Sequence, residues 1–145
     1  MANRELSKAE WLDKAEAYCA RSEHCAADIR RKLFEWGAPS DLFDEIEKTL
    51  YSRDFLTDVR FCQAYVHDKV AYQFWGRVKI RAGLQALQLP SSAVNDALND
   101  IDEAQYKANL NALRGQRKSD SEEKRMRFLL QRGFTFEEIK LASRF

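Results

Sequence analysis

The sequence predicts an all-α fold of tandem three-helix repeats, with about nine helices in three units forming an elongated, right- or left-curved array. Apolar residues recur at helical spacing rather than in alternation, and the 145 residues include only 5 Gly and 2 Pro. Residues 29–43 return in register as residues 80–94, with Ile, Arg, Leu, Pro and Ser at matching places. A weaker third copy spans residues 129–139. Self-similarity at about 45–50 residues is typical of stacked supersecondary units.

The first predicted unit covers residues 1–53, as an N-terminal helix and a first three-helix repeat. A capping box at residues 7–10 starts a helix that reaches about Ala20. Ser22 is the expected N-cap of the next helix, which Gly37 ends. Pro39 then opens a third helix.

The second predicted unit covers residues 54–102. Thr57 or Asp58 caps its first helix, and residues 74–76 interrupt it. A second helix follows as far as Pro90, and either of the serines at 91 and 92 caps the third. Gly83 lies inside the middle helix, where it costs about 1 kcal/mol relative to Ala, so we expect a close approach by another helix there.

The third predicted unit covers residues 103–145. A capping box at residues 102–105 starts its first helix, and residues 115–120 form a polar, charged loop. Residues 120–123 restart a helix that ends at Gly133. Residues 135–138 then cap the last helix.

The sequence offers little from which to build a catalytic site. It has no phosphate-binding glycine loop, nucleophile elbow or paired-histidine zinc motif, so we expect no enzyme and no cofactor. Its only histidines are His24 and His67. The three cysteines form no CxxC pair, which argues against a disulfide framework and a metal site. No apolar run reaches the ~20 residues that cross a bilayer, and the N-terminus is too charged for a secretory signal, so we expect a cytoplasmic protein without membrane contact.

Charge is segregated along the chain although the net charge is only +1. Residues 69–83 carry only positive charges, residues 91–105 only negative ones, and residues 114–132 mostly positive ones. Basic faces on a helical array suit a phosphate backbone or an acidic protein groove, although a solvated helix face explains them equally well. The partner- or DNA-binding candidates are Arg77, Lys79 and Arg81, then Lys124, Arg125 and Arg127, and more weakly Arg30 and Arg31. Aromatic residues beside them could stack on bases, but packing is the commoner role.

Three segments resemble the RecX family of bacterial regulators of the RecA recombinase. Residues 21–37 resemble its R-x-H-S, E-L, K-L, G signature, and residues 55–66 its L-D-D-x-R-F-A-x-x-Y/F-V block. Trp75 to Ile80 with Leu84 matches its G-x-x-x-I-x-x-x-L block. The sequence departs from the pattern at Thr57, where an acidic residue is expected, and at Cys62, where alanine is usual.

This resemblance implies a fold of tandem three-helix repeats and a non-enzymatic regulator of homologous recombination, DNA repair and the SOS response. Such a protein binds the RecA–DNA filament, contacts single-stranded DNA weakly or through the filament, and modulates, usually inhibiting, ATP hydrolysis and strand exchange. We expect a monomer. The alternatives are a stand-alone helical DNA-binding module and an adapter without a recombinase partner.

Overall fold

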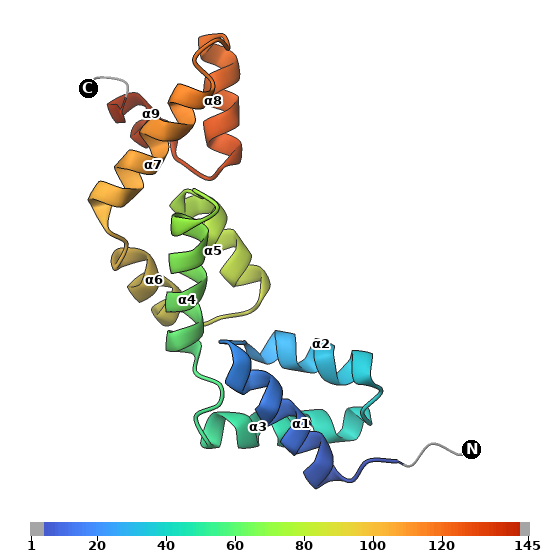
Figure 1. Ribbon diagram of the computed structural model, residues 1–145. Helices are drawn as coiled ribbons and strands as arrows, with labels where there is room; N and C mark the ends of the chain where they lie inside the picture. Colours follow the sequence, from blue (N-terminus) through green and yellow to red (C-terminus); the bar gives the residue numbers. More distant parts are fainter. Residues whose placement is uncertain (1–4, 143–145) are drawn as a thin grey trace. The chain divides into compact units, whose positions relative to one another are not determined.

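The computed structural model describes residues 5–142, and over this range it contains nine α-helices, one short 3₁₀ helix and no strand (Figure 1). The predicted all-α fold is confirmed. The helices are α1 (Lys8–Arg21), α2 (Ala26–Trp36), α3 (Phe43–Ser52), α4 (Asp58–Ala71), α5 (Arg77–Ala86), α6 (Ser91–Asn99), α7 (Glu103–Gln116), α8 (Glu122–Gln131) and α9 (Phe136–Ala142). None of these described helices is both long and apolar enough to cross a membrane.

The chain divides into two compact units, residues 1–61 and residues 62–145. Unit 1 holds α1 to α3 and the first turn of α4. Unit 2 holds the remainder of α4 and the helices α5 to α9. The three repeat boundaries expected from the sequence remain a prediction.

The core of unit 1 comes from one stripe on each of its three helices. Trp11, Ala15 and Cys19 of α1 meet Ile29 and Leu33 of α2 and the buried side chains of α3. These residues lie three or four positions apart, so each helix turns a single apolar face inward. The three helices therefore depend on one another to bury their apolar faces.

The core of unit 2 includes a helix pair and a group of three helices that follow α4. Helix α5 packs against α6, and α7, α8 and α9 pack against one another. Ile80 and Leu84 of α5 are fully buried, as are Leu129 and Phe134 from α8 and the link after it. The Phe134 ring lies 5.2 Å from that of Tyr106 in α7, centroid to centroid.

The sequence repeat is visible in the backbone. Helices α2, α5 and α8 end in the same way, with a left-handed residue at Gly37, Gln88 and Gly133. At each end the next N–H donates to a carbonyl five residues earlier: Ala38 to Leu33 (2.9 Å), Leu89 to Leu84 (3.2 Å) and Phe134 to Leu129 (3.2 Å). This is the helix-ending pattern that glycine favours because it has no Cβ to clash.

Most predicted helix starts are confirmed. Ser7, Asp102 and Ser121 accept hydrogen bonds from backbone N–H groups of α1, α7 and α8. Thr57 Oγ1 accepts from the Arg60 N–H (3.1 Å) at the start of α4. Thr135 and Glu138 form a reciprocal capping box at α9, as the spacing predicts.

Two expected caps are wrong. Helix α2 begins only after Cys25, because the Asp28 carboxylate accepts from the Cys25 N–H, while Ser22 follows α1 and bonds to His24. The N-cap of α6 is Pro90, without a side-chain hydrogen bond, so neither following serine is the cap.

Candidate interaction surface

The link between α4 and α5, residues 72–76, forms the centre of the candidate surface in unit 2. Helix α4 ends at Ala71, and the chain turns back through Phe74, whose φ is +55°. The Trp75 N–H donates to the Lys69 carbonyl (3.0 Å), which closes the end of α4. Gly76 then starts α5 with an extended backbone.

This link forms backbone hydrogen bonds with the α8–α9 connection. The Gly76 N–H donates to the Arg132 carbonyl (2.8 Å), and the Val78 N–H donates to the Gly133 carbonyl (3.0 Å). A Cβ on Gly76 would lie 2.3 Å from the Gly133 carbonyl carbon and oxygen. The second and third sequence repeats therefore meet backbone to backbone, and only glycine fits at this contact.

Lys69, Trp75 and Lys79 form a tryptophan–lysine cluster at this link. The ammonium nitrogens of Lys69 and Lys79 lie 4.5 and 4.4 Å from the centroid of the Trp75 ring. Among the described residues, neither lysine is within ion-pair distance of a carboxylate. Because an aromatic ring attracts cations without neutralising them, both positive charges stay available to an anion. Tyr72 and Val78 are exposed beside the cluster.

The charge of Arg77 is engaged by contacts within unit 2. Its guanidinium lies 4.3 Å from the Tyr106 ring centroid, pairs with Glu103 and lies 3.6 Å from Glu138. The Arg77 backbone N–H donates to the Tyr106 hydroxyl (3.0 Å), and burial raises the pKa of that phenol well above its usual range. Arg77 thus ties the start of α5 to α7 and α9.

Arg81 and Arg125 also make internal hydrogen bonds. Arg81 donates to the Asn95 side-chain oxygen (2.6 Å), which links α5 to α6. Arg125 donates to the carbonyls of Asp120 (2.7 Å) and Lys118 (3.2 Å), which fixes the loop before α8. Removing Arg125 would therefore loosen a loop as well as remove a charge.

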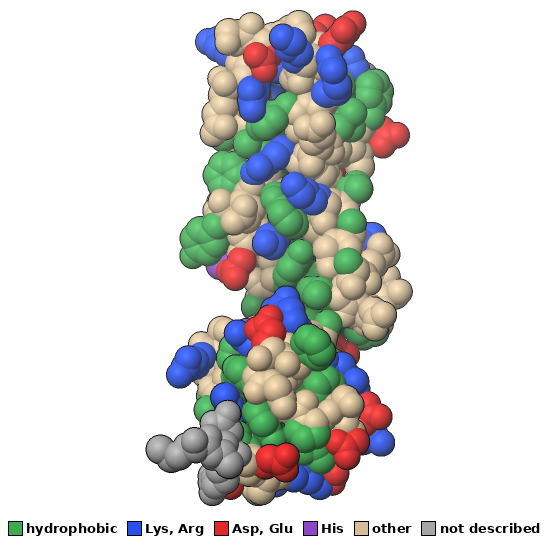
Figure 2. All heavy atoms as spheres, turned by 90° about the vertical axis from the view of Figure 1, so that its right-hand side faces the viewer, with side chains coloured by type: hydrophobic (Ala, Val, Ile, Leu, Met, Phe, Trp, Pro, Cys, Tyr) green, Lys and Arg blue, Asp and Glu red, His purple; other side chains and the backbone are tan. Residues whose placement is uncertain are grey.

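Lys124 and Arg127 are the exposed cations of α8. Among the described residues, no carboxylate lies within ion-pair distance of either side chain. They are three residues apart, so both side chains lie on one face of the helix. In Figure 2, Lys and Arg side chains lie over unit 2 with apolar side chains between them.

The two candidates in unit 1 differ in how closely carboxylates of the same chain engage their side chains. Arg30 donates to Glu47 (2.9 Å) and to Asp44, and these hydrogen bonds raise the pKa of Arg30 and lower that of Asp44. Arg31 is 60% exposed, with its closest carboxylate contact, to Asp28, at 3.5 Å.

The structure thus brings Arg77 and Lys79 together at the start of α5 and sets Lys124 and Arg127 on α8. Lys69 was missing from the candidates, although it opens the basic stretch. Lys69 lies six residues before Trp75, and this spacing does not place two residues on one face of a helix. The two side chains come together only because the chain turns after α4. No group of three or more His, Cys, Asp or Glu side chains able to hold a metal ion occurs within residues 5–142.

Comparison with known proteins gives concordant matches. The family model for the second three-helix domain of RecX matches residues 58–98, which include the whole tryptophan–lysine cluster. Regulatory protein RecX of Herminiimonas arsenicoxydans is 27% identical over 136 residues, which cover 90% of this chain and 89% of that protein. Regulatory protein RecX of Herbaspirillum seropedicae is 26% identical over 134 residues, covering 89% and 86%.

The fold matches a solved structure as well. The crystal structure of RecX from Lactobacillus salivarius aligns with a TM-score of 0.75 at 18% identity, over 94% of each chain. The family model and the relatives confirm the resemblance to the RecX family predicted from the sequence motifs, and the crystal structure shows that the fold is shared.

Proposed function

We propose that this chain regulates homologous recombination and DNA repair by binding the RecA–DNA filament and inhibiting its ATP hydrolysis and strand exchange. The observation that carries the proposal is the RecX match over residues 58–98, because that segment contains the tryptophan–lysine cluster. Relatives named regulatory protein RecX along most of the chain support the same role.

We assign direct contacts with the filament to Lys79, Lys124 and Arg127, with Arg31 as their counterpart in unit 1. These side chains are the candidates least engaged by internal hydrogen bonds and close ion pairs. We assign Arg30, Arg77, Arg81 and Arg125 a supporting role, since each already bonds within its own unit. Surface cations of this kind recognise carboxylates and phosphates, and screening weakens the attraction as salt rises.

Cationic groups in both units would let one chain make several weak contacts along a repeating filament. Once one contact forms, the others bind at a high effective concentration, so affinity comes from their combination. Single-stranded DNA is then contacted weakly or through the filament. The regulator acts in this proposal as a monomer in the cytoplasm.

ATP hydrolysis by RecA on single-stranded DNA tests the proposal. The chain is titrated against preformed filaments, beside the double variant Lys79→Ala/Arg127→Ala. We expect the wild-type chain to inhibit hydrolysis and the variant to need roughly two- to thirtyfold more protein, since two surface charge contacts contribute about 0.2–1 kcal/mol each, or about 0.4–2 kcal/mol together. A matched control, Lys48→Ala/Lys107→Ala, removes the same charge from exposed positions elsewhere.

Each result is decisive for one part of the proposal. Equal inhibition by both double variants and the wild type would exclude the cationic surface of α5 and α8. No effect of the wild-type chain on hydrolysis would refute the function itself. Arg77→Ala is unsuitable for this test because it also removes the packing on Tyr106 and the ion pair with Glu138.

A stand-alone nucleic-acid-binding module is the second candidate, and the tryptophan–lysine cluster with exposed Tyr72 favours it. Aromatic rings among cations bind single strands by stacking and by charge. This candidate predicts tight binding to naked single-stranded DNA, with a log–log salt slope of about −0.7 per phosphate contacted. Weak binding without RecA would exclude it.

A further inference from the structure

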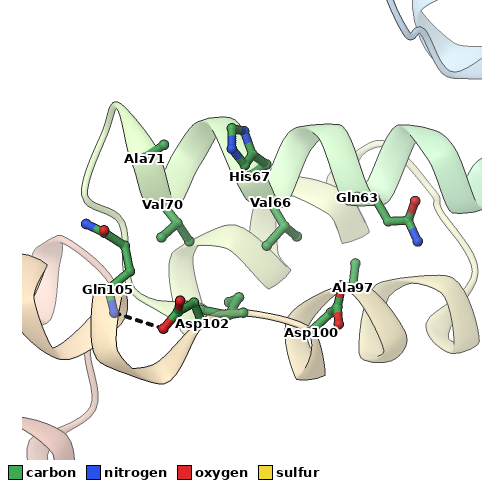
Figure 3. Close-up of a pocket in the computed structure, with 10 residues that line it drawn as sticks. Gln63, Val66, His67, Val70, Ala71, Ala97, Asp100, Asp102 and Gln105 are labelled. Atoms are coloured by element: carbon green, nitrogen blue, oxygen red, sulfur yellow. Dashed lines mark hydrogen bonds between the residues drawn. The ribbon is translucent and has the colours of Figure 1, made fainter.

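A groove of about 430 Å³ lies in unit 2 between α4 and the α6–α7 corner (Figure 3). One wall is α4, and the other is the end of α6, the link after it and the first turn of α7. The lining residues are Gln63, Val66, His67, Val70, Ala71, Ala97, Asp100, Ile101, Asp102 and Gln105. The groove shares no residue with the tryptophan–lysine cluster, so it is a separate surface.

The floor of the groove is apolar and held in shape. Val66, Val70, Ala97 and Ile101 line it, and each is more than nine-tenths buried. Buried Asn109 donates to the Val70 carbonyl (2.8 Å), which fixes the last turn of α4 against α7. An apolar group entering this groove would therefore meet a preformed surface.

The rim of the groove is negative. Its lining includes two carboxylates, Asp100 and Asp102, and no lysine or arginine. Asp102 is fixed in place because its Oδ1 accepts hydrogen bonds from the Ala104 N–H (2.9 Å) and the Gln105 N–H (3.2 Å) at the start of α7. Asp100 is exposed at the end of α6. The rim thus repels phosphates and attracts cations.

We propose that this groove binds a basic amphipathic helical segment of a partner protein. Apolar side chains of the segment lie on the Val66, Val70 and Ile101 floor, and its Lys or Arg side chains pair with Asp100 and Asp102. Apolar grooves between helices recognise amphipathic helices through anchors at i, i+3, i+4 and i+7, and the acidic rim selects basic ones. The proposal extends the function above, because it adds a protein partner on a surface of opposite charge.

A short fluorescein-labelled peptide of leucine and lysine at helical spacing is the probe, and a leucine–glutamate peptide of the same pattern is its counterpart. We expect fluorescence anisotropy to show saturable binding of the basic peptide alone. Titration by NMR should shift resonances of Val66, Val70, Ala97 and Ile101. Equal binding of both peptides, no binding, or shifts confined to other parts of the chain would overturn the proposal.

Charge reversal at the rim provides the specific test. Asp100→Lys should weaken binding of the basic peptide about three- to tenfold, because it replaces an attraction with a repulsion. The fold should tolerate it, since a cation is favourable at the C-terminal end of α6. The control is Glu123→Lys, which makes the same charge change at an exposed position of α8 outside the groove. This variant should leave binding of the basic peptide unchanged.

Two further outcomes are informative. Self-association of the chain that Asp100→Lys abolishes would show that a second copy occupies the groove, and would overturn the foreign partner proposed here. Inhibition of RecA does not enter this test. Failure of the peptide to bind would therefore leave the proposed function standing, and a chain without effect on RecA could still bind the peptide.

Discussion

Replacing Gly76 by alanine should break the junction between the α4–α5 link and the α8–α9 connection. The added Cβ would lie 2.3 Å from the Gly133 carbonyl carbon and 2.4 Å from the Phe134 nitrogen. These are backbone atoms, so no side-chain rotation relieves the clash. The two segments must separate, and the hydrogen bonds from the N–H groups of Gly76 and Val78 are lost.

The loss of stability in Gly76→Ala can be worked out from these contacts. Two backbone hydrogen bonds contribute about 0.5–1.5 kcal/mol each, and overpacking a tight contact costs about 1–3 kcal/mol. We therefore expect Gly76→Ala to lower the free energy of unfolding of unit 2 by about 2–6 kcal/mol. Gly115→Ala is the matched control, because a Cβ there meets nothing within 4 Å and alanine stabilises a helix by about 0.5–1 kcal/mol.

Urea unfolding followed by circular dichroism measures both variants. Native-state hydrogen exchange adds a local readout, since the amide protons of Gly76 and Val78 should exchange faster in Gly76→Ala than in the wild type. A free energy of unfolding within 0.5 kcal/mol of the wild type, or unchanged protection of the two amides, would refute the junction described here.

Three further results are expected from buried polar groups. Asn109→Ala should lower the free energy of unfolding by about 1–3 kcal/mol, measured by urea unfolding, because it leaves the Val70 carbonyl without its side-chain donor. Tyr106→Phe should lower the free energy of unfolding by about 1–2 kcal/mol in the same assay, because the Arg77 N–H loses its acceptor. Burial raises the pKa of the Cys19 thiol from its ordinary value of 9.0 to about 11, so the folded state favours the protonated thiol. The contribution of Cys19 to the free energy of unfolding is therefore fully present below pH 9.0 and is lost as pH rises through about 11. Iodoacetamide at neutral pH should therefore modify Cys19 far more slowly in the folded chain than in urea, as peptide mass analysis would show.

Local sequence signals account for most of the helix boundaries. A serine, threonine or aspartate caps its own helix within three residues, so Ser7, Asp102, Ser121 and Thr135 could be recognised without knowing the fold. Ser22 shows the limit of this reasoning, because Ser22 and Cys25 both adopt extended backbone and Asp28 decides where α2 begins.

The packing role of the repeat was also predictable. Ile29, Leu33 and their counterparts Ile80 and Leu84 are fully buried, since the repeat preserves the apolar stripe of each middle helix, and Val94 is fully buried as well. Trp36, Phe43 and Leu87 were expected in the same core but are only half-buried. Gly83 was expected to permit a close approach. The neighbour is the Tyr65 ring of α4, whose hydroxyl would lie 2.1 Å from an added Cβ.

The candidate site was less predictable because charge along a sequence does not reveal pairing in space. Arg77 and Lys79 look equivalent in the sequence. In the structure Arg77 packs on Tyr106, which lies 29 residues away, whereas Lys79 lies on Trp75. Contacts of this kind depend on how the second and third repeats meet at Gly76 and Gly133, which no local pattern encodes.

Binding to the assembled recombinase tests the central proposal most directly. The fluorescently labelled chain would be sedimented with RecA filaments on single-stranded DNA, and separately with the same DNA alone, at one fixed salt concentration. We expect saturable co-sedimentation with the filaments, weakened in Lys79→Ala/Arg127→Ala, and little with naked DNA. Equal binding to filament and naked DNA, or no binding to the filament, would contradict the proposed function.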